Sequence, residues 1–554
     1  MSDTPIKEVD VLIIGGGLAA LRAAIAAREA NASVAVIVKG KFGRSGSSAM
    51  TTGGYASFYS ELQNEDSATT HYEDTMKAGC YVANPDLVSI MCHEAEQGIK
   101  DLEKMGAQFL EESGEYYVEP SGEHSYPRVF LPKNRVGTDF TVPLGEYAKR
   151  IGVEPLEFTM AIELLVTNKQ VVGSVCVDTK TGELLVIKSG ATILATGGCG
   201  NLFSFTSNPR DVTGDGFALA AQAGASLRDM EFIQFYPWRC IKPFDKTRVS
   251  IQPPTFVSGG KLFNKNGERF MENYDPLRWE GTTRDVAARG IFDQIRKGLG
   301  EDGGVRLDLT EMSEEDFIKY NPKMWKGLKS KKIDYKNYHF VIAPEAHYFM
   351  GGIEIDENGQ SSVQGLYAAG EVAGGIHGAN RVNSNALPDT IVFGARAGKH
   401  AAIFAKNQSK KELNVQQVKK WLDIIMSSKG KEDSELLKGM KKQFKSQIDI
   451  SLGIVRTEEN INEGLRFIHS FKKKLSSQKP VSLEQFRSWM ELHFMCRVAE
   501  MSLTSALLRR ESRGAHFRED YPEQDNQYER SFYVLNYDEN GQLMESLQQR
   551  QFVL

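Results

Sequence analysis

The chain has 554 residues, more than one hydrophobic core usually accommodates, so two or three domains are expected. Its 67 Lys and Arg residues are balanced by 72 Asp and Glu residues, and the formal charge of -5 argues against a nucleic-acid-binding protein. The N-terminus has no basic region followed by an apolar one, and the most apolar stretch, residues 11–27, contains Arg22 and three glycines. We therefore expect neither a signal peptide nor a membrane span.

The six cysteines are scattered along the chain, and none forms a Cys-x-x-Cys pair. This spacing predicts neither a disulfide framework nor an iron–sulfur cluster held by this chain alone. A reducing, cytoplasmic setting fits such cysteines best. If the protein moves electrons, it needs an organic cofactor or another subunit to carry them.

The first predicted elements are a strand, a glycine turn, a helix and a second strand, in "EVDVLIIGGGLAALRAAIAAREANASVAVIVKG". Gly15 permits the tight turn, Gly17 lets the backbone approach a pyrophosphate, and Ala20 lets the helix pack closely on the strand. The helix N-terminus favours the phosphate charge. We favour a dinucleotide site over a purely structural glycine turn, because the motif stands in the strand–turn–helix context that such sites require.

The second strand departs from the usual dinucleotide pattern at its end. It finishes in Val38-Lys39, where an acidic residue usually holds the adenosine ribose, so we expect other groups, such as backbone atoms, to hold it. The polar, glycine-rich segment "GRSGSSAMTTGGYASF" (43–58) follows. It could lie against a flavin ring, although a segment of this composition standing alone would be interpreted as a flexible surface loop.

Two later stretches complete the nucleotide-binding pattern. "GATILATGGCGN" (190–201) is an apolar strand that runs into Ala-Thr-Gly-Gly, and "QGLYAAGEVAGGIHGANRVNSNALPD" (364–389) is a strand followed by Gly370-Glu371 and small residues. Such patterns close a two-part FAD-binding fold.

Taken together, the motifs resemble the flavoprotein subunit family of succinate dehydrogenase and fumarate reductase, which also includes L-aspartate oxidase and the adenylylsulfate reductase flavoprotein. The resemblance covers nearly the whole chain. Besides the N-terminal glycine turn, its marks are "ATGG" (195–198), "TGDGFALAAQAGASLRDMEFIQF" (213–235), "NKNGERFM" (264–271), "TTRDVAARGI" (282–291), "HYFMGGI" (347–353), "GLYAAGEVAGGIHGANR" (365–381) and "ESRGAHFREDYPEQD" (511–525).

The resemblance implies an α/β fold in which a Rossmann-like FAD-binding domain is built from two segments, 1–235 and 343–405. An α+β capping domain, 236–342, is inserted between them, and a helical domain with a C-terminal tail occupies 406–554. The sequence agrees, because a strand-rich segment from Tyr236 to about Ile342 interrupts the nucleotide-binding pattern and the chain becomes lysine-rich and helical after about Ala405.

The cofactor implied is FAD. We expect it to be bound non-covalently, because relatives with covalent FAD attach it to a histidine after the second strand, and residues 1–70 contain no histidine. The residues assigned to the cofactor are Gly15, Gly17, Ala20, Lys39, Ser45, Ser47, Ser48, Gly53, Gly54, Ala195, Thr196, Gly197, the Gly214-Asp215 turn, Gly370, Glu371, Arg381, Ala386 and Leu387.

Three further residues match the positions that handle substrate in this family. Arg284 matches the proton-transfer arginine, a role that requires an enclosed site because of the high pKa of arginine. The alternative for Arg284 is an ordinary ion pair with Asp285 or a nearby carboxylate. His347 and Arg381 match the residues that grip a substrate carboxylate, which an arginine can bind through two parallel hydrogen bonds.

The chain departs from the family pattern in the capping domain. The usual "QFHPT" is "QFYPW" here, which replaces a substrate-binding histidine by Tyr236 and the neighbouring threonine by Trp238. "IQPPTFVSGG" stands where dicarboxylate enzymes carry Thr-Glu-Gly before a glycine pair. We expect Tyr236 and Trp238 to form an aromatic wall, with Arg239 able to restore a cation if it turns inward. The alternative is an aromatic capping-domain core with a surface arginine.

These observations predict an FAD-dependent oxidoreductase subunit that transfers hydride between flavin N5 and a small organic acid, at a carbon–carbon bond. Electrons would pass to or from a separate iron–sulfur or other redox subunit, through which the protein could lie at the inner membrane face. The alternatives are adenylylsulfate-reductase-like chemistry at sulfur, an amino-acid oxidase resembling aspartate oxidase, and an idle flavoprotein that serves assembly. The retained Arg284, His347 and Arg381 argue against the last.

Overall fold

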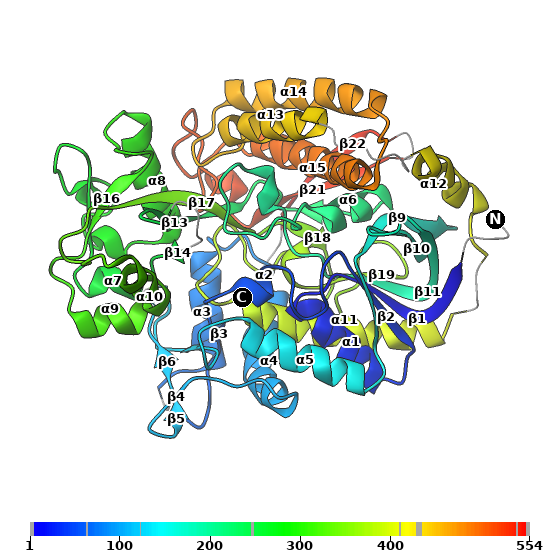
Figure 1. The fold of residues 1–554 in the computed structure, drawn as a ribbon, viewed down its shortest axis with the longest axis horizontal. Coiled ribbons are helices and arrows are strands. Elements are labelled where there is room, and N and C mark those ends of the chain that lie inside the picture. The colour runs from blue at the N-terminus through cyan, green and yellow to red at the C-terminus, as the bar shows by residue number, and fades with distance from the viewer. Residues whose placement is uncertain are drawn as a thin grey trace.

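The computed structural model of the chain describes residues 5–62, 65–121, 123–244, 249–408, 412–427, 435–538 and 541–549. A seven-stranded sheet forms the centre of its cofactor-binding part (Figure 1). Its strands run in the order β8-β2-β1-β11-β10-β9, and β19 also pairs with β11. In chain order they are β1 (Ile6–Ile14), β2 (Val34–Val38), β8 (Glu154–Glu157), β9 (Thr159–Thr167), β10 (Gln170–Asp178), β11 (Leu184–Leu194) and β19 (Leu366–Ala368).

The predicted opening unit is confirmed. Strands β1 and β2 are parallel neighbours and are joined by α1 (Leu18–Glu29). The alanine-rich α1 is almost wholly buried and packs against α11 (Ala386–Lys406), because its small side chains allow close approach. At the other edge of β1, β11 is also parallel, so the C-terminal ends of β1, β2 and β11 lie at one side of the sheet.

Between β2 and β8 the chain forms small elements around this body. They are α2 (Ser47–Met50), β3 (Tyr55–Ala56), α3 (Ala68–Ala78), α4 (Pro85–Lys104), β4 (Glu111–Glu112), β5 (Glu115–Tyr116), β6 (Val118–Glu119), β7 (Val129–Phe130) and α5 (Thr138–Arg150). After β11 come α6 (Asp215–Gln222) and β12 (Leu227–Arg228).

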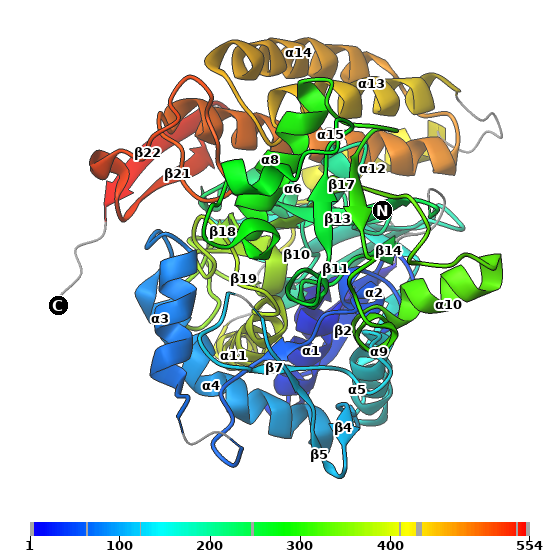
Figure 2. The same ribbon diagram turned by 90° about the vertical axis from the view of Figure 1, so that its left-hand side faces the viewer.

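A second, five-stranded sheet forms the capping part, drawn in green and facing the viewer in Figure 2. Its order is β14-β13-β17-β16-β15, and it has its own hydrophobic core. The elements are β13 (Ile233–Lys242), β14 (Val249–Ser250), α7 (Pro254–Val257), β15 (Lys261–Phe263), α8 (Arg284–Arg296), β16 (Val305–Asp308), α9 (Glu314–Tyr320), α10 (Pro322–Lys331) and β17 (Phe340–Phe349).

The C-terminal part is helical, as predicted, with α13, α14 and α15 lying along one side of the molecule (Figure 1). The helices are α12 (Val415–Ser427), α13 (Glu435–Ser451), α14 (Glu458–Ser477) and α15 (Leu483–Leu508). The tail adds a hairpin that sequence reasoning did not predict, β21 (Ser531–Tyr537) with β22 (Leu543–Gln549). This hairpin joins β12, β18 (Gly352–Glu354) and β20 (Ala373–Gly374) in a third sheet.

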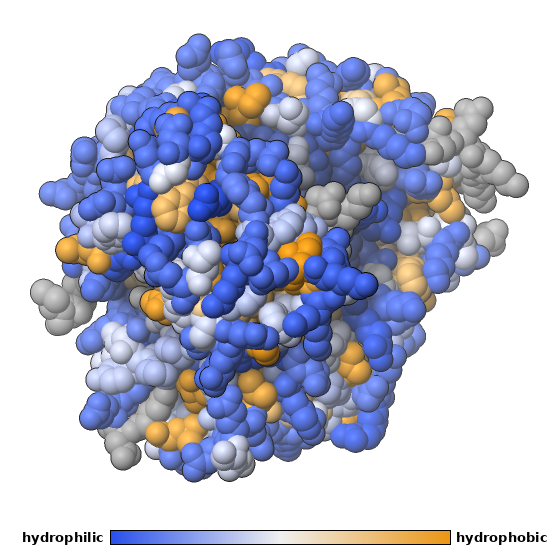
Figure 3. Space-filling view, turned by 60° about the vertical axis from the view of Figure 1, so that its left-hand side comes forward, coloured by the Kyte–Doolittle hydropathy of each residue, from blue (hydrophilic) through white to orange (hydrophobic). Residues whose placement is uncertain are grey.

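We propose the four-part division 1–235, 236–342, 343–405 and 406–554 for the domains, and β13 and β17 each cross one of its boundaries. Over the described residues, no helix combines the length and apolar character needed to cross a membrane. The face shown in Figure 3, with the capping side turned forward, is mostly hydrophilic, and its hydrophobic residues form small separate groups.

Candidate active site

A cavity of about 650 Å³ runs between the nucleotide-binding sheet and the capping part. This volume lies in the range of cofactor and substrate pockets. The sequence-predicted residues that line it are Gly15, Gly17, Lys39, Ser45, Ser47, Ser48, Gly53, Gly54, Ala195, Thr196, Gly197, Asp215, Tyr236, Arg239, Arg284, His347, Gly370, Glu371, Arg381, Ala386 and Leu387. Three predicted residues do not line it: Ala20, which lies inside α1, Gly214, which precedes α6, and Trp238.

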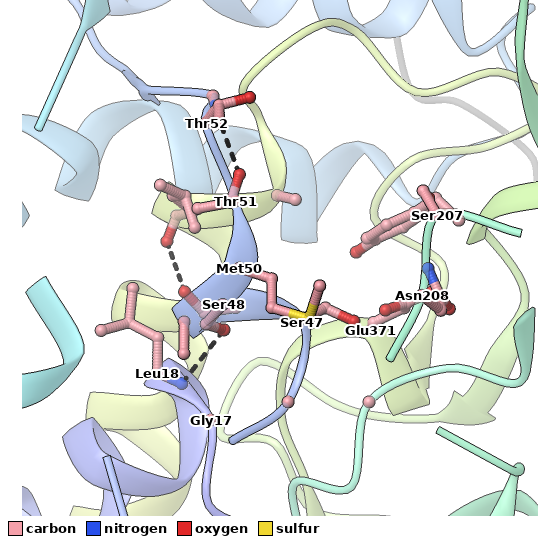
Figure 4. Close-up of a pocket in the computed structure, with 18 of the residues that line it drawn as sticks. Gly17, Leu18, Ser47, Ser48, Met50, Thr51, Thr52, Ser207, Asn208 and Glu371 are labelled. Atoms are coloured by element: carbon pink, nitrogen blue, oxygen red, sulfur yellow. Dashed lines mark hydrogen bonds between the residues drawn. The ribbon is translucent and has the colours of Figure 1, made fainter. Parts of the chain in front are cut away.

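The glycine turn brings the backbone of β1 against the end of β11. Gly15 has φ of +134°, and a Cβ there would lie 2.0 Å from the carbonyl oxygen of Ala195, so no other residue fits. Gly17 is the residue that precedes α1, and Ser48 Oγ accepts a hydrogen bond of 3.2 Å from the Leu18 amide beside it (Figure 4). Ala20 is fully buried inside α1, as close helix packing requires.

The end of β2 meets acidic residues that come from other elements. Lys39 Nζ lies 2.9 Å from both Thr213 Oγ1 and Asp215 Oδ2, and 3.5 Å from Glu491 Oε1. Burial acts to lower the pKa of Lys39, but the two carboxylates outweigh it and the pKa is raised. Gly214 starts α6 in a left-handed conformation and so aims Asp215 at the cavity. The structure therefore places a carboxylate of α6 beside the end of β2, paired with Lys39.

Several hydroxyl groups that line the cavity lack protein partners. Within the described residues, the buried side-chain oxygens of Ser47, Thr196 and Ser384 have no hydrogen-bond partner. Buried polar atoms are normally satisfied, so these three point to a polar ligand in the cavity. Figure 4 shows Ser47 and Ser48 of α2 on one side of this space and Ser207 and Asn208 on the other. Together with the glycine turn, they fit a bound dinucleotide such as FAD.

Glu371 is a buried residue that lines the cavity. Its Oε1 accepts a hydrogen bond of 3.1 Å from the Phe349 amide, and a Cβ on Gly198 would lie 2.1 Å from the same oxygen. Burial raises the pKa of Glu371 to about 7. This carboxyl group can therefore exist in either protonation state near neutral pH.

Two arginines meet on the capping side of the cavity. Arg284, the first residue of α8, donates from Nη1 to Gln234 Oε1 at 3.3 Å and from Nη2 to Asn383 Oδ1. Arg381 Nη2 donates to the same Gln234 oxygen at 2.9 Å. Burial and the charge of Arg284 lower the pKa of Arg381 to about 10. The alternative for Arg284 was an ion pair with Asp285 or a nearby carboxylate. Among the described contacts its side chain donates only to the amide oxygens of Gln234 and Asn383, and Asp285 accepts from Asn380.

His347 and Tyr236 lie beside these arginines on neighbouring strands. The ring centroids of Tyr236 and His347 are 5.3 Å apart, and the Arg284 guanidinium lies 5.2 Å from the Tyr236 ring. Ser207 Oγ lies 2.8 Å from His347 Nδ1 and fixes the orientation of the ring. Burial, reinforced by Arg381 and Arg284, holds the pKa of His347 well below its usual range, so the imidazole is neutral at pH 7.

The expected aromatic wall is only half present. Tyr236 lines the cavity, but Trp238 is buried in the capping core, 4.7 Å from the Phe256 ring centroid. The pairing of β13 with β17 shifts register between Tyr236 and Arg239, which turns Trp238 away from the cavity. Arg239 does turn inward, and its Nη1 lies 3.1 Å from Glu345 Oε2.

Comparison with protein families identifies the chain. A family model described as "FAD binding domain" matches residues 10–387, and one described as "Fumarate reductase flavoprotein C-term" matches residues 441–550. The chain belongs to the fumarate reductase and succinate dehydrogenase flavoprotein family. It is an FAD-dependent oxidoreductase.

Relatives of this flavoprotein cover nearly its whole length. An uncharacterized FAD-dependent oxidoreductase of Methanocaldococcus jannaschii is 39% identical over 93% of this chain and 94% of that protein. One subunit of the CoM/CoB fumarate reductase of Methanothermobacter marburgensis is 36% identical over 96% of this chain and 98% of that protein. A solved structure of a variant of E. coli quinol fumarate reductase superposes with a TM-score of 0.89 at 26% identity, over 100% of this chain and 98% of that one.

Sequence reasoning missed several residues that line the flavoprotein's cavity or support its arginines. Gln234 and Asn383 stand inside motifs that were quoted but received no role, and Glu345 and Ser207 carried no motif at all. The pairing of β13 with β17 is what brings Glu345 opposite Tyr236. Only Gln234 and Asn383 had a usable signal, because both lie in segments that carry family motifs.

Proposed function

We propose that this flavoprotein transfers hydride to or from a carbon of a small organic acid, at a carbon–carbon single or double bond. The observation that carries the proposal is the arginine pair. Within the described contacts, the side chains of Arg284 and Arg381 bond only neutral oxygens. Two buried cations without a carboxylate partner are costly, and an anionic substrate between them offsets that cost.

Each residue of the site then has a distinct role. Arg381 and neutral His347 bind a carboxylate of the substrate, and Arg284 holds or delivers the proton on the carbon face away from the flavin. The chemistry that bound FAD supplies is hydride exchange at N5. We assign the binding of FAD to Gly15, Gly17, Thr196, Glu371, the hydroxyl groups of α2 and the hydroxyl group of Ser384.

The far end of the substrate differs from that of a dicarboxylate enzyme. Tyr236 presents a phenol ring in place of a histidine, and its hydroxyl donates to the Ile251 carbonyl oxygen. Arg239 brings a cation, but Glu345 neutralises it. We therefore propose a substrate with one carboxylate at the arginine pair and a bulkier or less charged far end.

We also propose a separate redox subunit. The six cysteines are free thiols, five of them buried, and the described residues contain no cluster of side chains suited to hold a metal ion. Relatives carry names that mark them as parts of larger enzymes, such as the 8-methylmenaquinol:fumarate reductase flavoprotein subunit of Wolinella succinogenes. A partner with an iron–sulfur or other redox centre would link this flavin to the rest of an electron chain, in the cytoplasm or at the inner membrane face.

The test is a viologen-linked assay of the purified protein with a panel of unsaturated monocarboxylic acids that differ in bulk, and with the matching saturated acids and an oxidised dye. Turnover of at least one acid, lost in Arg381→Met, supports the proposal. Turnover of adenylylsulfate alone would replace it with chemistry at sulfur, and peroxide release in air with an L-amino acid would replace it with an oxidase.

A further inference from the structure

Gln234 lies on β13 between the two site arginines, and it is fully buried. Its side-chain oxygen accepts hydrogen bonds from Arg284 Nη1 at 3.3 Å and from Arg381 Nη2 at 2.9 Å. Because one oxygen binds both, these two nitrogens lie within about 6 Å of each other. That spacing allows a single anionic group to contact both guanidiniums.

The other half of the amide fixes this orientation. Gln234 Nε2 donates to Asn380 Oδ1 and to the Arg381 carbonyl oxygen, each at 2.9 Å. A flipped amide would point its NH₂ group at two guanidinium donors and its oxygen at two acceptors. The contacts of the surrounding residues therefore hold the Gln234 oxygen towards the arginines.

The acceptors around Arg284 are also uncharged. Gln234 contacts Nη1 and Asn383 Oδ1 accepts from Nη2, so both ends of this guanidinium are positioned by amides. A glutamate or aspartate at either position would make the same geometric contact but would add a negative charge. Within the described residues, Arg381 Nε is buried and has no hydrogen-bond partner, which leaves a donor for a ligand.

We propose that Gln234 is a positioning residue that holds Arg284 and Arg381 side by side without neutralising either, so that one anionic group binds across both guanidiniums. The identity of that group as the carboxylate of a substrate rests on the proposed function. The positioning role itself concerns anion binding and does not require turnover.

The test titrates FAD-loaded variants with acetate. Binding is monitored by isothermal titration calorimetry and by the change in the flavin absorbance spectrum. Gln234→Glu keeps the shape and the acceptor but places a carboxylate between the arginines, so acetate affinity should fall at least about ten-fold. Asn383→Asp should weaken acetate binding in the same direction, and its position is only half-buried, so it serves if Gln234→Glu does not fold. Gln234→Met keeps both charges but loses the shared acceptor that holds the arginines side by side, so acetate affinity should also fall, though by less than in Gln234→Glu.

The matched control is Gln294→Glu. Gln294 is another buried glutamine, on α8, but its partners are Asn264 and Tyr274 in the capping part. Acetate affinity of this variant should equal that of the parent, even if its thermal stability drops.

Two outcomes would overturn the inference. One is a folded, FAD-loaded Gln234→Glu or Asn383→Asp that binds acetate as tightly as the parent, which is the result that a purely structural role predicts. The other is a parent protein to which acetate does not bind. Failure of the proposed function would give a different result. The variants would still differ in acetate affinity as predicted, but no organic acid would be turned over.

Discussion

Arg239 and Glu345 form a buried ion pair across β13 and β17, with 3.1 Å between Nη1 and Oε2 and no exposed surface on the Glu345 side chain. Removing the carboxylate from such a buried contact typically costs about 3 kcal/mol. We predict that Glu345→Gln lowers the thermal unfolding temperature clearly, whereas Glu345→Gln combined with Arg239→Met restores part of the loss. Unfolding followed by calorimetry on the three proteins measures this. A double variant no more stable than Glu345→Gln would contradict it.

Arg284 should be essential for turnover but not for the cofactor. Arg284→Lys keeps a positive charge but loses the forked contacts to Gln234 and Asn383. Turnover should fall by roughly two to four orders of magnitude, the scale of a lost acid–base group. The FAD content per protein should remain that of the parent. Turnover within a few-fold of the parent would return Arg284 to a structural role.

FAD should be released by acid. The first histidine of the chain is His71, which is buried, lies 2.8 Å from Asn385 Oδ1 and does not line the cavity. The segment around α2 therefore has no histidine of its own to bond the flavin. Acid precipitation should leave the yellow colour in the supernatant, and colour that stays with the pellet would refute a non-covalent flavin.

Glu371 should make the stability of the FAD-free protein depend on pH. Burial raises its pKa to about 7, whereas an unfolded glutamate has a pKa of about 4.3. Between these values the folded protein keeps a proton that the unfolded chain has released, so the free energy of unfolding falls as the pH rises through this window. Glu371→Gln lacks this contribution. The variant should therefore gain stability relative to the parent, by up to about 3.5 kcal/mol between pH 4 and pH 8, as measured by denaturant unfolding. If the free energies of unfolding of the parent and of Glu371→Gln change in parallel with pH, the raised pKa of Glu371 is contradicted.

Fumarate should be a poor substrate. Losing a hydrogen bond to a charged group costs about 1.5–3 kcal/mol. Beside Arg284 and His347 the cavity offers Tyr236, where the family pattern has a histidine. In a reduced-viologen assay the parent should turn over fumarate far more slowly than its best unsaturated monocarboxylic acid, and Tyr236→His should narrow the gap. Trp238→Phe is the matched control, because Trp238 lies outside the cavity, and it should leave the preference unchanged. Fast fumarate reduction by the parent protein would contradict the proposal that the substrate pocket differs from that of a dicarboxylate enzyme.

The sequence predicted the parts of this molecule whose chemistry is local. Gly15 and Gly17 could be assigned from the turn alone, because backbone approach is a property of a few adjacent residues. Trp238 could not be placed, because alternation along β13 assumes a regular register and the pairing with β17 shifts just there. The roles of Glu345 and Ser207 could not be predicted for a related reason, because their partners Arg239 and His347 lie in distant segments of the chain. The C-terminal hairpin likewise depends on strand partners roughly 300 residues away.

That hairpin has a consequence for how the protein is made. In the third sheet, Leu227 and Arg228 of β12 pair with Leu535 and Val534 of β21. A ribosome synthesises β12 roughly 300 residues before β21, so the nascent flavin-binding body carries an open strand edge through most of translation. Chains truncated before residue 531 keep that edge open permanently, and they would be targets for chaperones and proteases rather than active fragments.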